Sequence, residues 1–296
     1  MEDKELAEWK KAGEAAAKIS EYARKIIRPG MPLLEIAERL EEEAIKLNVK
    51  WAFPVNLSIN EIAAHYSPQQ GDTTIAEGLL KVDLGMNVNG FISDTAFSLD
   101  LTKEQKFKKM IKVNENALKD AIKTVKSGEK VSEIGRAIHD SIVESGFSPV
   151  RNLSGHQIER YSVHAGLTIP NYDNKNQAEI EEGRIYAIEP FATTGEGIVQ
   201  DGKPSGIYLL KELKPARDKT TRDILRFIAE EYKTLPFSAR WIVNKFGIRA
   251  LMSLNVLEQQ EILYQFTQLI EKSRAPVSQA EHTILVEKDK VTILTA

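Results

Sequence analysis

The chain has 296 residues, of which 42% are hydrophobic and 28% are charged, as in an ordinary globular protein. Its 40 basic and 43 acidic residues give a formal net charge of −3, which argues against broad nucleic-acid binding because such binding needs a basic face. Cysteine is absent, which excludes disulfides, thiolate zinc sites and cysteine nucleophiles. Any metal must therefore be held by oxygen and imidazole ligands.

The N-terminus, MEDKELAEWK, is charged and helical in pattern and lacks the apolar core of a signal peptide. We find no unbroken apolar run of the roughly 18 residues that a membrane span needs. The sequence therefore predicts a cytoplasmic protein without a membrane segment.

Hydrophobic periodicity predicts the elements in chain order. Two helices (4–27 and 34–47) precede a loop-like, ordered segment (51–71) and a β-hairpin (79–101). Two more helices follow, the first opened by a capping box at Thr102 and Gln105 and running to 126, the second from 132 to 145 and closed by Gly146. Later segments read as strands (162–164, 185–188, 283–286 and 291–294) around an almost wholly helical block (220–272). The order indicates an α+β domain with an inserted helical block.

The hairpin has a geometry that can be worked out from its turn. Asn89-Gly90 is a strong two-residue hairpin signal, and such a turn places opposite each other residues whose numbers sum to 179. Asp83 and Asp94 then point to the same side as diagonal neighbours, with Cβ atoms about 7 Å apart.

Two carboxylates on a mostly buried face repel each other and lose hydration, which costs several kcal/mol unless it is compensated. A shared proton, a basic partner or a metal could compensate them. Lys81 is the nearest cation in sequence and lies on the same side as Asp83. From the hairpin alone, a solvent-exposed acidic face or pairing with Lys81 is as well supported as a metal.

Three further residues shift that balance. His156 follows a Ser-Gly pair, Glu189 ends an apolar strand before Pro190, and Glu281 precedes another apolar strand. Each alone is more often structural. Together with the hairpin pair they supply four carboxylates and one imidazole, a charge that two divalent cations would balance. Such a ligand set suits Mn, Fe(II) or Co as readily as Zn, so the native metal stays undecided.

The motifs at these positions and around them resemble those of the type II methionine aminopeptidases, in their archaeal form. The resemblance spans nearly the whole chain, and its motifs are Phe53–Asn60, Ala63–Pro68, Val82–Gly85 with Asp94, Asn152–Gly166, Tyr186–Phe191 and Ala280–Thr283. It implies the pita-bread fold, a curved antiparallel sheet backed by helices. It also implies a catalytic domain of residues 1–205 and 273–296 and a helical insertion of residues 206–272.

The resemblance further implies residue roles. Asp83 and Asp94 would bind one metal, Asp94, His156 and Glu189 the other, and Glu281 would bridge the two. Glu189, His65 and His164 would be catalytic. The substrate would be contacted by His65, His164, Phe53, Val163 and Phe191.

The implied activity is removal of the N-terminal methionine from nascent proteins whose second residue is small, by attack of a water or hydroxide that bridges two divalent ions (Co, Mn, Fe(II) or Zn). Nascent N-termini are the expected partners and the ribosome a candidate one, with a monomer and no sequence-specific nucleic acid expected. The rivals are another metallopeptidase or creatine-type hydrolase on this fold, and a non-catalytic scaffold that binds RNA or proteins. An intact ligand set argues against the scaffold.

Overall fold

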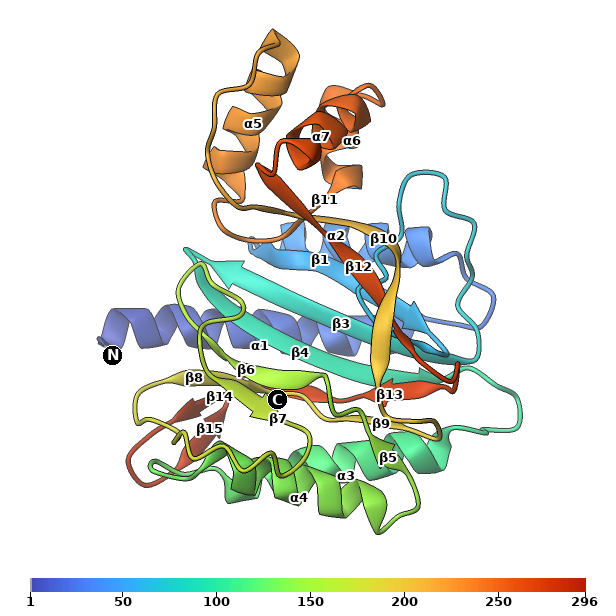
Figure 1. Cartoon of the computed structure of the whole chain (residues 1–296), viewed down its shortest axis with the longest axis vertical. Helices are drawn as coiled ribbons and strands as arrows, with labels where there is room; N and C mark the ends of the chain where they lie inside the picture. Colours follow the sequence, from blue (N-terminus) through green and yellow to red (C-terminus); the bar gives the residue numbers. More distant parts are fainter. Residues whose placement is uncertain (1) are drawn as a thin grey trace.

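A computed structural model of the chain, which describes residues 2–296, is organised around a curved antiparallel sheet of eight strands (Figure 1). The spatial order is β1-β3-β4-β14-β8-β6-β7, and β15 pairs with β14. The strands are β1 (Lys50–Ile59), β3 (Leu79–Val88), β4 (Phe91–Asp100), β6 (Ser154–Ile158), β7 (Thr168–Pro170), β8 (Ile185–Ile188), β14 (Glu281–Val286) and β15 (Val291–Ile293). Strands β4 and β14 are therefore the seam at which the N-terminal and C-terminal parts of the sheet meet.

Two pairs of helices cover one face of this sheet. The first pair packs on β1 and β3 and the second on β8 and β14, through two separate apolar clusters. The helices are α1 (Asp3–Ile26), α2 (Leu33–Lys46), α3 (Lys108–Thr124) and α4 (Val131–Val143). Alternate strand residues such as Leu84 and Ile284 point into these clusters, so their neighbours Asp83 and Thr283 point to the other face. The α+β architecture predicted from the sequence is confirmed.

Shorter strands extend the fold beyond the main sheet. They form a four-stranded sheet of order β11-β10-β12-β2 and a three-stranded sheet of order β13-β9-β5. Their bounds are β2 (Ile62–Ala64), β5 (Ser148–Pro149), β9 (Phe191–Thr193), β10 (Val199–Leu210), β11 (Phe237–Ser238), β12 (Leu263–Glu271) and β13 (Val277–Gln279).

The helical block stands at the end of a long two-stranded ribbon, β10 and β12, at the top of Figure 1. Its helices are α5 (Lys219–Glu231), α6 (Ala239–Phe246) and α7 (Ala250–Gln259). They enclose an apolar cluster of their own, which includes Ile224, Ile228, Ile242 and Leu254. The sequence pattern predicts breaks in this block at Pro236 and at Gly247–Asn255. The break at Pro236 is confirmed. The second break is shorter than predicted, because α7 already begins at Ala250.

Two of the predicted elements are strands where the sequence suggested otherwise. Segment 51–71, expected as a loop, contains most of β1 and all of β2. Residues 263–271, expected as helix, form β12 because they pair along β10, from Val199 opposite Glu271 to Leu210 opposite Leu263. Pairing with a distant strand overrides local helical pattern.

One helix boundary and one short strand were also predicted wrongly. Helix α3 begins at Lys108 instead of Thr102, because the Asp100 carboxylate accepts hydrogen bonds from the backbone N–H groups of Thr102 and Phe107 and holds the intervening residues in turns. The predicted strand at 162–164 is a turn, in which Glu159 and Ser162 exchange backbone hydrogen bonds.

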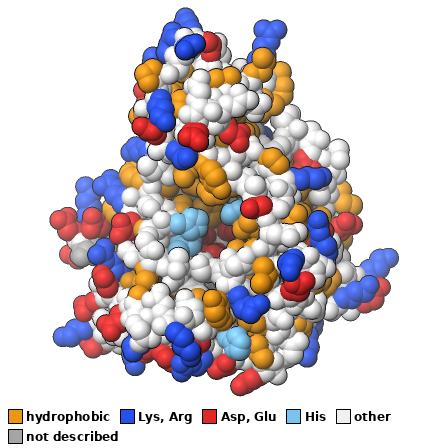
Figure 2. All heavy atoms as spheres, viewed as in Figure 1, with side chains coloured by type: hydrophobic (Ala, Val, Ile, Leu, Met, Phe, Trp, Pro, Cys, Tyr) orange, Lys and Arg blue, Asp and Glu red, His pale blue; other side chains and the backbone are white. Residues whose placement is uncertain are grey.

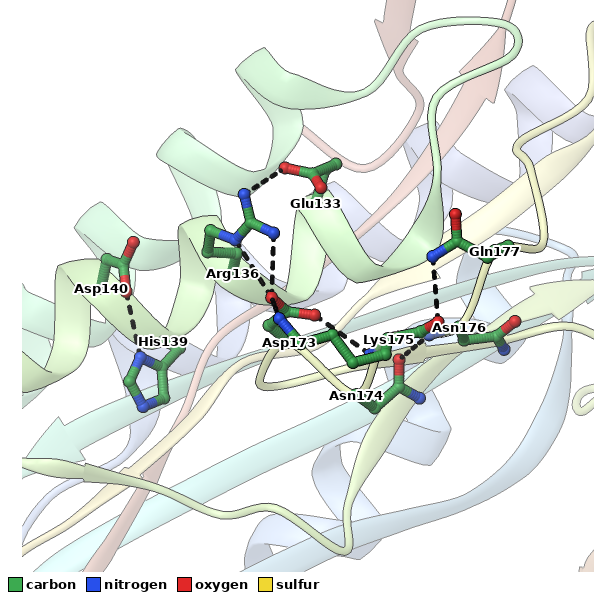
Figure 3. Close-up of polar contacts among 9 residues, drawn as sticks. All are labelled: Glu133, Arg136, His139, Asp140, Asp173, Asn174, Lys175, Asn176 and Gln177. Atoms are coloured by element: carbon green, nitrogen blue, oxygen red, sulfur yellow. Dashed lines mark hydrogen bonds and ion pairs between the residues drawn. The ribbon is translucent and has the colours of Figure 1, made fainter.

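The connection after β7 is held by its own side chains (Figure 3). Asp173 accepts a hydrogen bond from the backbone N–H of Lys175 and pairs with Arg136 of α4 at 2.9 Å. Asn174 and Asn176 make similar short-range bonds to the backbone two residues on. These contacts fix the loop against α4, on the side of the molecule that carries the second helix pair.

Candidate metal centre and pocket

The hairpin of β3 and β4 places its two aspartates as predicted. Asn89 and Gly90 have φ values of 54° and 94°, the left-handed conformation of a tight hairpin turn. Asp83 lies opposite Ala96, and Asp94 lies opposite Gly85, so opposed residues sum to 179. Both carboxylates therefore lie on the face that the helices leave uncovered.

The second part of the sheet brings the remaining predicted ligands to the same face. Glu281 also lies opposite Ala96, across β4 and β14. His156 lies opposite Ala187, and Glu189 follows Ala187 by two residues at the end of β8. Ala96 and Ala187, with Gly85, put small residues between the large polar side chains, which leaves space among them.

Asp94, His156 and Glu281 form a compact cluster of buried groups. Each offers a ligand atom, and these atoms all lie within 4.8 Å of one another. His156 Nε2 lies 3.6 Å from Asp94 Oδ2. Asp83 and Glu189 are close enough to interact electrostatically with the Asp94 carboxylate. All five predicted ligands thus come together although they are scattered over 199 positions of the chain, from 83 to 281.

Burial changes the protonation of these groups. It raises the pKa of Asp83 to about 7, and it raises the pKa values of Asp94, Glu189 and Glu281 well above their usual range, with further increases from the neighbouring carboxylates. Burial lowers the pKa of His156 to about 3. Without a cation, the cluster therefore favours protonated acids beside a neutral imidazole.

Four carboxylate oxygens of these acidic residues lack a hydrogen-bond partner. Among residues 2–296, Asp83 Oδ1, Asp94 Oδ1 and both carboxylate oxygens of Glu281 are buried and accept no hydrogen bond. Lys81 does not neutralise them, since its Nζ donates to the backbone oxygens of Asn60 and Leu79 at 2.7 and 3.4 Å. Unsatisfied buried carboxylate oxygens next to a neutral imidazole fit divalent cations.

Asp83, Asp94, His156 and Glu189 line a pocket of about 270 Å³. Figure 2 shows histidine side chains bordering a hollow in this face, with acidic atoms inside it. Phe53, His65, Val163 and His164 line the pocket as predicted. Phe191 is not among the lining residues; it lies in an adjoining apolar cluster.

The two pocket histidines are held in place and are uncharged at neutral pH. His65 has a φ of 63°, unusual for a residue other than glycine, and its Nδ1 lies 3.1 Å from the backbone oxygen of Thr267. Burial lowers its pKa to about 4. The ring of His164 packs edge-on against that of His156 at 4.3 Å, and burial lowers the pKa of His164 also.

The sequence did not reveal one wall of the pocket. Ile207, Pro236, Phe266 and Leu269 line it and come from β10, β12 and the connection between α5 and β11. In the sequence these apolar residues stand in or beside a polar, helix-like pattern, which does not indicate a pocket wall. Phe266 and Leu269 reach the pocket only because β12 pairs with β10. Phe266 packs its ring against His65 at 5.4 Å.

The other two histidines lie outside the pocket, as the sequence suggested. His139 is exposed on α4 beside Asp140 (Figure 3). His282 points to the opposite face of β14 from Glu281, and its Nδ1 lies 2.9 Å from the Thr295 hydroxyl.

Residues 7–249 match metallopeptidase family M24. The chain is 45% identical over 288 residues to the methionine aminopeptidase of Pyrococcus abyssi, which covers 96% of this chain and 97% of that protein. The structure of the present chain is similar to that of a thermophilic Arx1, with a TM-score of 0.86 and 15% identity over 99% of this chain and 91% of that one. It is also similar to the structure of the methionine aminopeptidase of Thermotoga maritima, with a TM-score of 0.71 and 22% identity over 100% of this chain and 98% of that one. These similarities confirm the predicted pita-bread fold.

Among the helices that the structure describes, within residues 2–296, none combines the length and the apolar character that a membrane span requires.

Proposed function

Because the chain belongs to metallopeptidase family M24, we propose that it is a metal-dependent aminopeptidase that removes the N-terminal methionine from polypeptides whose second residue is small. One observation carries this function beyond family membership. Asp83 and Asp94 keep buried, unsatisfied carboxylate oxygens and line a pocket that histidines border, and the unsatisfied Glu281 carboxylate lies beside Asp94. A protein that used the fold only as a scaffold would have no reason to retain so costly an arrangement.

The five ligands would hold two divalent ions, and their oxygen and imidazole atoms suit Co, Mn, Fe(II) and Zn. Asp83 and Asp94 would bind one, Asp94, His156 and Glu189 the other, and Glu281 both. When bound, such ions neutralise the four carboxylates, lower the pKa of coordinated water and polarise a carbonyl group.

Three side chains of the protein would transfer the proton, stabilise the developing charge and orient the peptide. Glu189, which lines the pocket and has a raised pKa, would carry a proton from the attacking water to the leaving amine. His164 would donate a hydrogen bond to the scissile carbonyl oxygen, where negative charge develops. His65, fixed by the Thr267 carbonyl, would orient the peptide beside that bond.

The pocket walls would select the substrate. Phe53 and Val163 supply apolar surface near the carboxylates, suited to an unbranched thioether side chain. Phe266 and Pro236 narrow the pocket from the side of the helical block. A confined space beyond the scissile bond favours a small second residue.

We also propose that residues 206–272 form an insertion subdomain on a catalytic domain of residues 1–205 and 273–296. The separate apolar cluster of α5, α6 and α7 supports this division. Nascent polypeptide N-termini in the cytoplasm are the proposed substrates of a monomeric enzyme, and the ribosome is the candidate docking partner.

The function is tested with a Met-Ala-Ser peptide. Chelator-treated protein is reloaded with Mn or Co, and release of methionine is measured beside the Asp94→Ala variant. We expect the reloaded wild-type chain to cleave and the variant to lose cleavage, with Asp289→Ala, a change in the turn before β15, as the control. Unaltered cleavage by Asp94→Ala would contradict the proposed centre, and a wild-type chain that purifies and reloads without stoichiometric metal would point to a scaffold.

A further inference from the structure

The seam between β4 and β14 is joined by side-chain hydroxyl groups as well as by backbone pairing. Its register runs through Glu281 opposite Ala96 and His282 opposite Thr95. The strands on either side carry Asp94 and Glu281, two of the three groups in the compact cluster. Whatever fixes this seam therefore fixes the spacing of those two carboxylates.

The Thr283 hydroxyl makes two hydrogen bonds to the backbone of Asp94. It accepts a hydrogen bond from the Asp94 N–H at 2.7 Å and donates one to the Asp94 carbonyl oxygen at 2.7 Å. The Thr283 side chain has no solvent exposure. Both polar backbone groups of Asp94 are thus satisfied by one side chain on the opposite strand.

A second hydroxyl makes the reciprocal contact. Thr95, the neighbour of Asp94, donates its hydroxyl proton to the backbone oxygen of Glu281 at 2.8 Å. Each of the two acidic residues is therefore bonded through its backbone to a threonine of the other's strand. The Thr95 side chain lies on the helix-covered face of the sheet and the Thr283 side chain on the face of the metal ligands. Side-chain hydrogen bonds therefore join β4 to β14 on both faces of the sheet.

A third hydroxyl extends the seam to Asp83. The Ser98 hydroxyl donates to the backbone oxygen of Gln279 at 2.8 Å and accepts from its N–H at 2.9 Å. The Gln279 side-chain amide in turn donates to Asp83 Oδ2 at 3.3 Å. The hydroxyls of Thr283, Thr95 and Ser98 thus join β4 to the C-terminal strands β14 and β13, and the Gln279 amide reaches Asp83 on β3.

We propose that Thr283 and Thr95 are positioning residues, whose hydroxyls hold Asp94 and Glu281 at the separation that divalent cations require. The inference rests on the proposed function for its metal centre. Cations require these acidic groups in their charged forms, which burial and close approach destabilise, and a seam of neutral hydrogen bonds keeps the two strands at a fixed separation without adding charge. Partners that orient metal ligands change affinity by about 10–100-fold when removed.

The decisive variant is Thr283→Val, which keeps the shape of the side chain and removes both bonds to Asp94. Cobalt(II) is titrated into the chelator-treated protein, and its affinity and visible absorption are recorded independently of any peptidase assay. We expect the variant to bind Co(II) about 10–100-fold more weakly and with an altered spectrum. Thr283→Ser, which keeps the hydroxyl, should recover most of the affinity.

Thr221→Val is the matched control. Thr221 is equally buried and its hydroxyl bonds Ser253 at 3.0 Å, but it lies in α5 within the helical block. This variant should lose stability and keep wild-type cobalt affinity. Thr95→Val provides a second test of the seam if Thr283→Val does not fold, and it too should weaken cobalt binding.

Wild-type cobalt affinity and spectrum in a folded Thr283→Val or Thr95→Val variant would overturn the inference, and so would an equal loss in Thr221→Val. A wild-type chain that binds no cobalt would overturn it together with the proposed function. A wild-type chain that binds cobalt but releases no methionine would overturn the proposed function alone, because the comparison of affinities would still decide the role of the seam.

Discussion

Arg240 and Glu41 form a bidentate ion pair that joins α6 of the helical block to α2, one of the helices that cover the sheet. Arg240 Nη1 and Nη2 lie 2.9 and 2.5 Å from the two Glu41 carboxylate oxygens. The Trp241 indole N–H donates to the same carboxylate at 2.7 Å, and Arg240 Nε donates to the Pro68 carbonyl oxygen. Because Arg240 is only 1% exposed, this contact fixes α6 against α2 and, with it, the pocket wall that the block supplies.

Glu41→Gln should therefore destabilise the protein by about 3 kcal/mol, because it leaves a buried guanidinium without its counter-charge. The measurement is urea unfolding of the wild-type and variant chains. Glu35→Gln is the control, since Glu35 pairs with Arg39 on the same helix with both side chains exposed, and its loss should cost about 0–1 kcal/mol. Equal effects of the two changes would contradict this view of the Arg240 contact.

The metal-free protein should lose stability as the pH rises from 6.5 to 8. A carboxyl whose pKa is raised by folding binds more protons in the folded than in the unfolded state, so its contribution is full below about pH 4 and is lost as the pH rises through the folded pKa, about 7 for Asp83. The lowered pKa of His156 has the opposite effect, but only as the pH falls below 6.5. Burial also lowers the pKa of the Lys81 amine, which acts in the opposite sense, but the raised pKa values of Asp94, Glu189 and Glu281 outnumber it and decide the sign above 6.5.

Urea unfolding at pH 6.5, 7 and 8, with chelator or with saturating Mn(II), measures this dependence. Bound cations should abolish or reverse the loss, because they require the ligands in their deprotonated form. Stability that is flat or rises with pH in chelator would show that the carboxylates are neutralised by groups of the protein itself.

The relationship between Asp83 and Asp94 could be predicted from the sequence because a two-residue turn fixes register, and register fixes the face of every side chain. Periodicity likewise predicted the four helices that cover the sheet and the strands β8, β14 and β15. Convergence of His156, Glu189 and Glu281 on that face could only be argued from charge balance and family resemblance, since the pairing of β6, β8 and β14 joins residues far apart in the chain.

The missed features share one cause, which is that long-range pairing decided them. Strand β12 looks helical in sequence and becomes a strand on β10, and this brings Phe266 and Leu269 into the pocket. The seam hydroxyls of Thr95 and Thr283 are invisible for the same reason. Single threonines carry no signal until the opposite strand is known.

Gly85→Ala should impair substrate binding. Gly85 faces Asp94 across the hairpin, and a Cβ atom at this position would lie 2.3 Å from Cε1 of Phe53. The added methyl group would displace the Phe53 ring that lines the pocket, raise KM for a methionyl peptide and lower stability by about 1–3 kcal/mol. The double variant Gly85→Ala/Phe53→Leu should relieve the clash and recover stability. An unchanged KM in Gly85→Ala would show that this wall does not contact substrate.

Glu189→Gln should separate metal binding from proton transfer. The change keeps an oxygen that can face a cation and removes the group that accepts and releases a proton, so we expect kcat to fall about 10²–10⁴-fold at saturating Mn(II). Metal content is measured by mass spectrometry on the same samples, and kcat is measured with Met-Ala-Ser. His139→Asn, an exposed change on α4, should leave kcat at the wild-type value. If the fully loaded Glu189→Gln variant retains wild-type kcat, another group must move the proton, and His164, which also lines the pocket, becomes the candidate.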